Sequence, residues 1–146
     1  MNSVEQNLNL LMVDISSRLP YKVIVECPVV SYVTSIPSRI DYCVLTSVDA
    51  LRQTYSIGTK YTRRANLPII SRGKIVIKPL LRPMSSMTKD ERLIYENLCN
   101  CIDEGLIKAF DYLNSIHVDY RGFIELGLAI DVTKLNKNPY DDEFIY

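Results

Sequence analysis

The chain contains no tryptophan, a single histidine and no unbroken run of eighteen apolar residues among its 146 residues. Without such a run, it has no candidate for a membrane-spanning helix. One histidine supplies neither the H-E-x-x-H motif nor the usual ligand spacing of a zinc site. A Walker loop, a G-x-G-x-x-G and a G-x-S-x-G elbow are also missing, which excludes the common nucleotide-binding and serine-hydrolase motifs.

Cysteine is also scarce, with four residues at Cys27, Cys43, Cys99 and Cys101. The last two are separated by one residue in a segment with a helical pattern, so they point to different faces and do not readily share a metal ion or a disulfide. Residues 1–19 are amphipathic and charged, unlike a signal peptide. We expect a protein with reduced thiols, made in a cytoplasm, without a metal or a cofactor.

Charge is unevenly distributed, although the formal net charge is zero. Residues 1–83 hold eleven basic and five acidic side chains, a net of +6, and residues 84–146 hold six basic and twelve acidic ones, a net of −6. Residues 50–89 carry nine Lys or Arg and no Asp or Glu. This polarity indicates a surface that attracts anions, or two poles that pair within one molecule or between copies.

The apolar pattern predicts a single α+β domain over residues 1–146. Residues 1–20 form an N-terminal helix, which begins at a capping box of Ser3 and Gln6 and ends at Pro20. Residues 21–80 are a β-rich core of short runs punctuated by Pro and Gly, typical of a small antiparallel sheet or a partly open β-barrel. Inside this core, Arg72-Gly73 between two apolar runs predicts a two-residue hairpin turn.

A helical unit is predicted after the β-rich core. Two prolines mark residues 78–88 as a connector, because proline fits neither a helix interior nor a sheet interior. Thr88 and Glu91 form a second capping box, so a helix begins near Lys89. Its apolar stripe continues to about Ser115, as one helix or two.

The end of the chain carries weaker signals. Gly127 follows residues 122–126 at the position that ends a helical turn. Residues 128–132 are a short apolar run that predicts a final strand, so residues 81–132 form a helical unit and final strand packed on the sheet. Residues 133–146 are expected to form a loose acidic tail.

Three segments carry a resemblance to a known family: S-R-L-P-Y-K-V (17–23), K-P-L-L-R-P-M-S-S-M-T (78–88) and D-Y-R-G-F-I-E-L-G-L-A (119–129). They are similar to motifs of small, uncharacterised proteins from Bacteroidetes phages and integrated mobile elements. Members usually have Gly, Tyr and Leu where this chain has Lys22, Leu80 and Phe123. The resemblance covers both ends and fits residues 24–76 poorly. It implies a phage or prophage origin and an accessory or virion role, in the cytoplasm of the bacterial host or in the virion.

Residues 50–89, the acid-free window, supply a candidate nucleic-acid-binding surface. Its residues are Arg52, Lys60, Arg63, Arg64, Arg72 and Lys74 with Tyr55 and Tyr61. Cations replace the counterions condensed on nucleic acid, and unpaired bases stack on aromatic rings. The alternative is that these cations are solvated on outer strand faces or pair with the acidic C-terminal helices. That arrangement is the commoner one in a chain of zero net charge.

Tyr120 and Arg121 are a candidate protein-interaction site, since these residue types are enriched in binding hot spots. The alternative is structural: Gly122 permits a tight turn, Arg121 pairs with Asp119 or Asp111, and Tyr120 locks the last helix onto the sheet.

Ser85, Ser86, His117 and Asp119 include the residue types of a nucleophile, a base and an acid, but their spacing has no catalytic pattern. We therefore expect a non-enzymatic phage accessory protein that acts by binding. Its partner is nucleic acid, or, in the alternative, a host or virion protein, as a host-factor inhibitor or a minor virion component.

Overall fold

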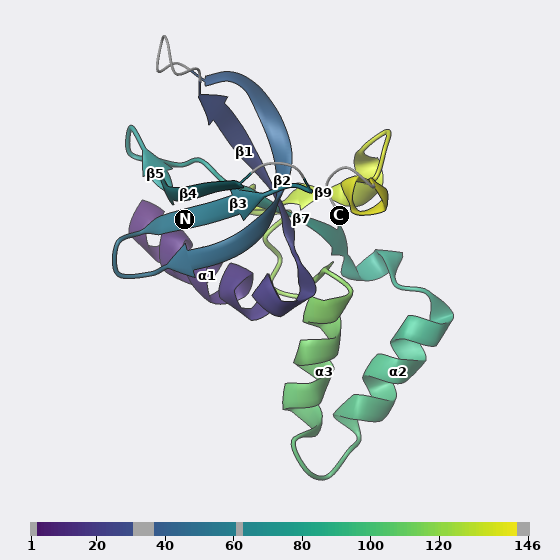
Figure 1. Cartoon of the computed structure of the whole chain (residues 1–146). Coiled ribbons are helices and arrows are strands. Elements are labelled where there is room, and N and C mark those ends of the chain that lie inside the picture. Colours follow the sequence, from purple (N-terminus) through teal and green to yellow (C-terminus); the bar gives the residue numbers. More distant parts are fainter. Residues whose placement is uncertain (1–2, 31–36, 61–62, 143–146) are drawn as a thin grey trace.

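The computed structural model describes residues 3–30, 37–60 and 63–142, and Figure 1 shows their arrangement. In chain order the helices and strands are α1 (Val4–Arg18), β1 (Ile24–Val30), β2 (Pro37–Asp49), β3 (Thr54–Gly58), β4 (Arg63–Pro68), β5 (Ile70–Ser71), β6 (Lys74–Ile75), β7 (Lys78–Pro83), α2 (Lys89–Cys99), α3 (Gly105–Ser115), β8 (Val118–Asp119) and β9 (Ile130–Asp131). Short 3-10 helices lie at Leu19–Tyr21, Met84–Ser86, Val132–Lys134 and Pro139–Asp141. Among these described helices, none is both long and apolar enough to cross a membrane.

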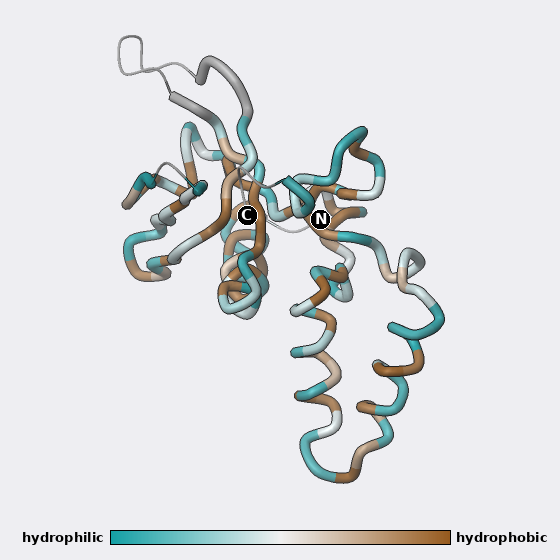
Figure 2. Tube along the Cα trace, turned by 45° about the vertical axis from the view of Figure 1, so that its right-hand side comes forward, coloured by the Kyte–Doolittle hydropathy of each residue, from teal (hydrophilic) through white to brown (hydrophobic). Residues whose placement is uncertain are grey.

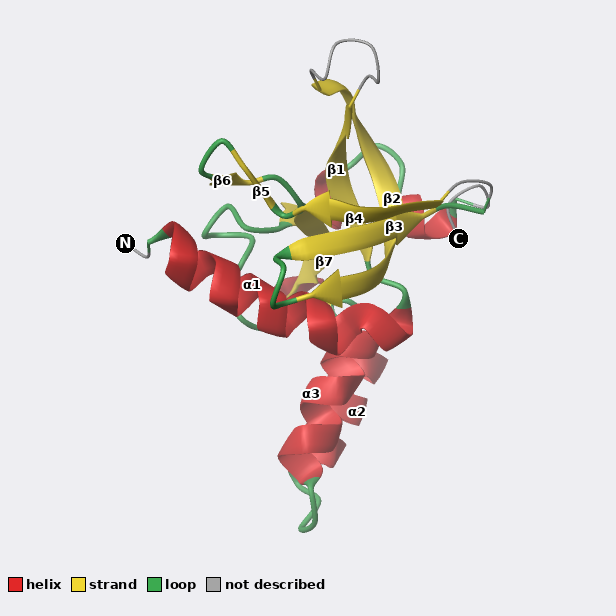
Figure 3. Cartoon of the chain, turned by 60° about the vertical axis from the view of Figure 1, so that its left-hand side comes forward, coloured by secondary structure: helices red, strands yellow, loops and turns green. Residues whose placement is uncertain are grey.

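The main sheet has the strand order β4-β3-β2-β1-β7-β8, and β9 also pairs with β7. Strands β1 to β4 and β7 pair in antiparallel fashion, whereas β8 and β9 run parallel to β7. The α+β prediction is confirmed, but the sheet is mixed and is not closed into a barrel. Helix α1 lies across one side of this sheet (Figure 3).

Helix α1 forms where the sequence predicts it, because its capping box is made. The Ser3 hydroxyl accepts a hydrogen bond from the Gln6 N–H at 3.2 Å, and the Gln6 side chain accepts one from the Ser3 N–H at 2.8 Å. One face of the helix buries Leu8, Leu11 and Ile15 in a core shared with the strands. Burying side chains of this size contributes about 1.5–3 kcal/mol each, which makes this face the main attachment of α1.

The predicted hairpin at Arg72-Gly73 is confirmed as the turn between β5 and β6. Both turn residues have positive φ, 55° and 74°, as a tight turn that matches the strand twist requires. The ladder extends beyond the two strands, since the Val76 N–H donates to the Ile69 carbonyl at 2.9 Å. The hairpin therefore stands as a small ribbon of its own, separate from the main sheet.

Residues 78–83 are strand β7 and not part of a connector, so this expectation was wrong. Pairing with β1 covers only Lys78 and Pro79, and Pro83 is the last residue of the strand, so the missing N–H groups interrupt no long ladder. Leu80 and Leu81 are fully buried. The strand joins the antiparallel part of the sheet to the two short parallel strands.

Two helices, and not one, follow the second capping box. The Glu91 N–H donates to the Thr88 hydroxyl at 3.1 Å, and α2 ends at Cys99. Gly105 then starts α3 so close to α2 that a Cβ atom there would lie 2.5 Å from the Leu98 carbonyl oxygen. The resulting helical hairpin packs at its base, through Met87, Leu113 and Val118, and projects away from the sheet (Figures 1 and 3).

The predicted helical turn over 122–126 is present, with the Leu126 N–H donating to the Gly122 carbonyl and Gly127 at φ 73°. The final strand is shorter than expected, as only Ile130–Asp131 pair in β9.

Residues 133–142 are not a loose tail, which corrects that expectation; residues 143–146 lie outside the described part. The Tyr140 hydroxyl accepts a hydrogen bond from the Ile24 N–H at 3.1 Å and donates one to the Leu80 carbonyl at 2.8 Å. Its ring stacks on His117, with centroids 4.3 Å apart. These contacts fasten the segment to β1 and β7.

A buried ionic network joins α1 to the segment after α3. Asp14 and Arg18, both without solvent exposure, form a two-bond ion pair at 3.0 and 3.1 Å. Arg18 also donates to the Val118 carbonyl at 2.8 Å, and Arg121 donates to Asp14 at 2.6 Å. Since an unpaired buried charge is costly, each member depends on the others.

Replacing Arg18 with Gln leaves the Asp14 carboxylate without its main buried partner. We expect the free energy of unfolding in urea to fall by about 3–5 kcal/mol. The control is Arg52→Gln, because Arg52 faces Asp49 across 3.9 Å in an exposed pair, and its loss changes stability by less than about 0.5 kcal/mol. Equal losses in the two variants would contradict a structural role for the network.

Candidate functional site

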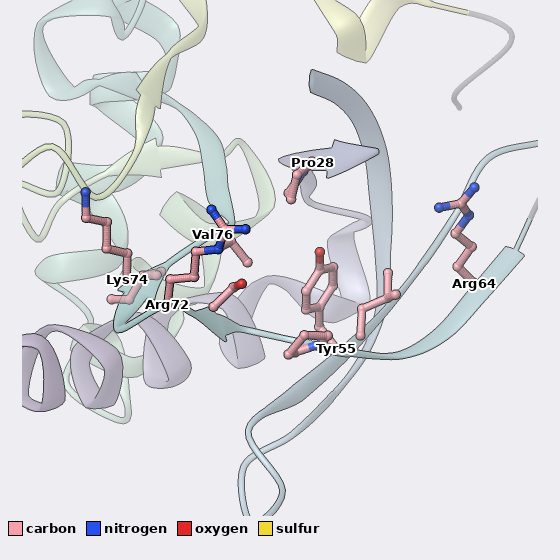
Figure 4. A pocket seen from close by; sticks show the side chains of 10 residues that line it. Pro28, Tyr55, Arg64, Arg72, Lys74 and Val76 are labelled. Atoms are coloured by element: carbon pink, nitrogen blue, oxygen red, sulfur yellow. The ribbon is translucent and has the colours of Figure 1, made fainter. Parts of the chain in front are cut away.

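A pocket of about 430 Å³ lies between β1, the β3–β4 pair and the β5–β6 hairpin (Figure 4). Its apolar lining comes from Pro28, Leu67, Pro68, Ile75 and Val76. Three cations also line it: Arg64 from β4, Arg72 from the hairpin turn and Lys74 from β6. The volume falls within the usual range for ligand sites, which are mostly apolar with a few placed polar groups.

The electrostatics of the pocket are one-sided, because no Asp or Glu lines it. Arg72 and Lys74 are exposed, and within the described residues no carboxylate forms a salt bridge with either of them. Figure 4 shows Arg72 and Lys74 on one side of Tyr55 and Arg64 on the other. An anionic group that enters the pocket therefore meets cations on both sides of an apolar floor.

Tyr55 belongs to this floor and is only 3% exposed. Burial raises the pKa of its hydroxyl, and so do the two nearby thiols, so it stays a neutral hydrogen-bonding group. With so little of its ring exposed, Tyr55 is not an open platform for base stacking. It offers the pocket an edge and a hydroxyl.

Cys27 and Cys43 lie near Tyr55. The sequence pattern did not predict that these two cysteines come together. Cys27 and Cys43 lie on adjacent strands, where Val25 is the direct partner of Cys43, so both thiols share one sheet face. Their mutual hydrogen bond raises the pKa of Cys27 and lowers that of Cys43. Both cysteines stand in the predicted β-rich core, but the register in which two strands pair cannot be read from the sequence. Among the described residues, no group of three or more His, Cys, Asp or Glu could hold a metal ion.

The remaining predicted nucleic-acid-binding residues lie elsewhere. Arg52 occupies the turn after β2 beside Asp49, and Lys60 and Arg63 line a separate hollow with Lys22. Tyr61 lies outside the described residues. Arg63 and Arg64 diverge because successive side chains of a strand point to opposite faces. The structure thus brings together Tyr55, Arg64, Arg72 and Lys74 and separates them from the other three.

Arg82, another cation of the acid-free window, is neutralised within the protein. It donates to both carboxylate oxygens of Glu91, at 2.6 and 2.7 Å, and to the Ser86 hydroxyl and carbonyl. These hydrogen bonds are the main reason that the pKa of Glu91 is lowered to about 2. The pair clamps β7 to the start of α2.

Tyr120 and Arg121 are held in the ionic network, with part of Arg121 exposed. The guanidinium of Arg121 lies 4.6 Å from the centroid of the Tyr120 ring and binds Asp14, not Asp119 or Asp111. Asp119 instead accepts hydrogen bonds from the N–H groups of Phe123 and Ile124, both at 2.9 Å. The Tyr120 hydroxyl donates to Asn114 at 2.9 Å, so this tyrosine contacts α3.

The side chains of Ser86, His117 and Asp119 interact with different groups. The Ser86 hydroxyl donates to the Pro83 carbonyl at 2.6 Å. His117 is enclosed: its burial, and then the charges of Arg18 and Arg82, lower its pKa to about 4. A neutral imidazole stacked on Tyr140 fits a structural position.

In comparisons with family models, curated proteins and solved structures, nothing matches this chain. The fold and the pocket define an α+β protein with a cationic, apolar-floored pocket at one end and a projecting helical hairpin at another.

His117 makes stability depend on pH. Its pKa falls from 6.5 to about 4 on folding, so the unfolded chain binds the extra proton between these values. We expect its contribution to be complete above pH 6.5 and to decline as pH falls to 4, by about 3 kcal/mol in total. The lone histidine gives one pair of imidazole C–H NMR signals, whose chemical shifts should stay nearly constant from pH 8 to 5. His117→Gln should flatten the pH dependence of the free energy of unfolding. A titration midpoint near pH 6.5 for the imidazole of the folded protein would contradict the lowered pKa.

Proposed function

We propose that this protein acts by binding, without catalysis, and that its pocket takes single-stranded nucleic acid. The observation that carries the proposal is that Arg64, Arg72 and Lys74 line one pocket, which has an apolar floor and no carboxylate in its lining. A nucleotide combines the two matching features, a flat apolar base and an anionic phosphate. The base occupies the floor, and phosphates on either side meet the cations.

A single strand suits this pocket better than a duplex does. The lining is concave and its cations stand on both sides of the floor, so an unpaired base enters while its flanking phosphates stay outside. Bases inside a duplex are stacked and paired, and reaching a pocket requires flipping them at a cost of a few kcal/mol. The Tyr55 hydroxyl adds a neutral hydrogen-bonding group for a base edge.

The setting that we propose is a phage or prophage accessory protein in the cytoplasm of the bacterial host, or in the virion. The resemblance of residues 17–23, 78–88 and 119–129 to phage and mobile-element proteins supports this setting. Single-stranded nucleic acid is present there during replication, recombination and transcription.

A second proposal is a protein-interaction or structural role, as a host-factor inhibitor or a minor virion component. It is favoured by the apolar side chains that α2 and α3 leave exposed, such as Leu93, Ile107 and Phe110. Exposed apolar groups in such number are typical of contact surfaces.

The nucleic-acid proposal is tested by fluorescence anisotropy with a labelled oligothymidylate over a range of salt concentrations. Arg72→Glu with Lys74→Glu should lower the affinity at least about tenfold, because each removes a phosphate contact. Contacts to a single strand contribute about −0.7 each to the slope of log affinity against log salt. The slope for the double variant should therefore be less negative than that of the wild type by about 1.4.

The matched control uses two neighbouring arginines of β4. Arg64→Glu should weaken binding strongly, whereas Arg63→Glu makes the same change in charge on the other face of the strand and should have a much smaller effect. If both variants bind alike, the pocket is not the site. If the wild-type protein does not bind the oligonucleotide at low salt, the proposal fails altogether.

A further inference from the structure

The α2–α3 hairpin carries an unusual share of exposed apolar side chains. Twelve large apolar residues are exposed among those described, and six of them lie on this hairpin: Leu93, Ile94, Ile102, Leu106, Ile107 and Phe110. Figure 2 shows brown, apolar segments on both helices, away from the sheet. Such a projection, left in water, exposes surface that contact with another protein would bury.

The tip of the hairpin combines apolar groups with acids. Ile102 is 99% exposed and Leu106 is 62% exposed, and the carboxylates of Asp103 and Glu104 lie between them in the chain. The close approach of Gly105 to Leu98 defines the turn that presents these side chains. The tip is therefore a narrow apolar projection flanked by two negative charges.

The pocket on the other side of the molecule has the complementary character. Its floor is apolar, its volume of about 430 Å³ has room for one or two aliphatic side chains, and its cations are Arg64, Arg72 and Lys74. The hairpin and the β5–β6 ribbon lie at different ends of the molecule (Figures 1 and 3), so a tip meets the pocket of another copy and not its own.

We propose that the chain self-associates head to tail: Ile102 of one copy enters the pocket of the next, where Asp103 and Glu104 pair with Arg72 and Lys74. This self-association is one form of the structural role proposed above and does not depend on nucleic-acid binding. Because the tip and the pocket are different surfaces, a pair of copies still has one free tip and one free pocket. Association therefore continues into a chain of copies or closes into a ring.

Charge favours this contact over a symmetric one between two hairpins. Residues 89–111 contain three basic and six acidic side chains, so two hairpins side by side bring like net charges together. Contact between tip and pocket brings the acids to a lining that has cations and no carboxylate. Complementary charges raise the association rate and suppress the wrong pairing.

The test measures the mass of the full chain by sedimentation velocity as its concentration rises. The wild-type mass should climb above that of the monomer, and less so at high salt. Ile102→Asp removes the apolar tip, and Arg72→Glu with Lys74→Glu reverses the pocket; each variant alone should remain monomeric. Leu51→Asp makes the same apolar-to-acid change at a residue that is 94% exposed on another turn, and should associate like the wild type.

Mixing the two defective variants distinguishes head-to-tail contact from every symmetric alternative. The pocket variant keeps an intact tip, and the tip variant keeps an intact pocket, so together they should form a dimer of twice the monomer mass that grows no further. Association of the pocket variant by itself would point to hairpin–hairpin contact and overturn the proposal. So would a wild-type protein that stays monomeric, or a mixture of folded variants that forms no dimer.

Oligonucleotide binding by Ile102→Asp separates this proposal from the nucleic-acid one. The variant retains the whole pocket, so it should bind at least as well as the wild type, because no competing tip is present. Failure of self-association with retained oligonucleotide binding rejects only the present proposal. Self-association without oligonucleotide binding rejects only the other.

Discussion

The buried contact between Asp14 and Arg18 is the interaction on which the rest of the structure depends. Its ion pair crosses one turn of α1, and further bonds reach the Val118 carbonyl and Arg121. One side-chain nitrogen of Arg18 and the Nδ1 of His117 are buried without a hydrogen-bond partner among the described residues. Two guanidinium groups near His117 favour its neutral form. The ionic network thus links α1 to β8 and to the residues after it, in addition to the apolar contacts of Leu8, Leu11 and Ile15 with the sheet.

Residues 17–23, 78–88 and 119–129 meet around this network. Arg18 comes from the first segment, Arg82 from the second and Arg121 from the third, and each bonds to another element: Arg18 to the Val118 carbonyl, Arg82 to Glu91 and Arg121 to Asp14. The residues that line the pocket, in contrast, all lie between positions 28 and 76, outside these three segments. The scaffold and the proposed binding surface therefore belong to different parts of the chain.

Local signals predicted much of the fold. Both capping boxes, the Arg72-Gly73 turn and the helical turn before Gly127 occur as expected, because each depends on residues no more than five apart in the chain. The predictions that failed were non-local. Strand β7 was mistaken for a connector, since its prolines matter less when pairing on each side is short, and the tail was thought loose because Tyr140 gives no hint of its bonds to Ile24 and Leu80.

By itself, the sequence determined where the first two helices begin, where the tight hairpin turns and that forty consecutive residues lack an acid. Only the tertiary structure decided which cations share a surface. Strand alternation sends Arg63 and Arg64 apart, long-range pairing places Arg82 against Glu91, and the β5–β6 ribbon brings Arg72 and Lys74 to the pocket of Arg64. The physical reason is range: caps and turns form within a few residues, whereas the convergence of charges depends on the register of strands far apart in the chain.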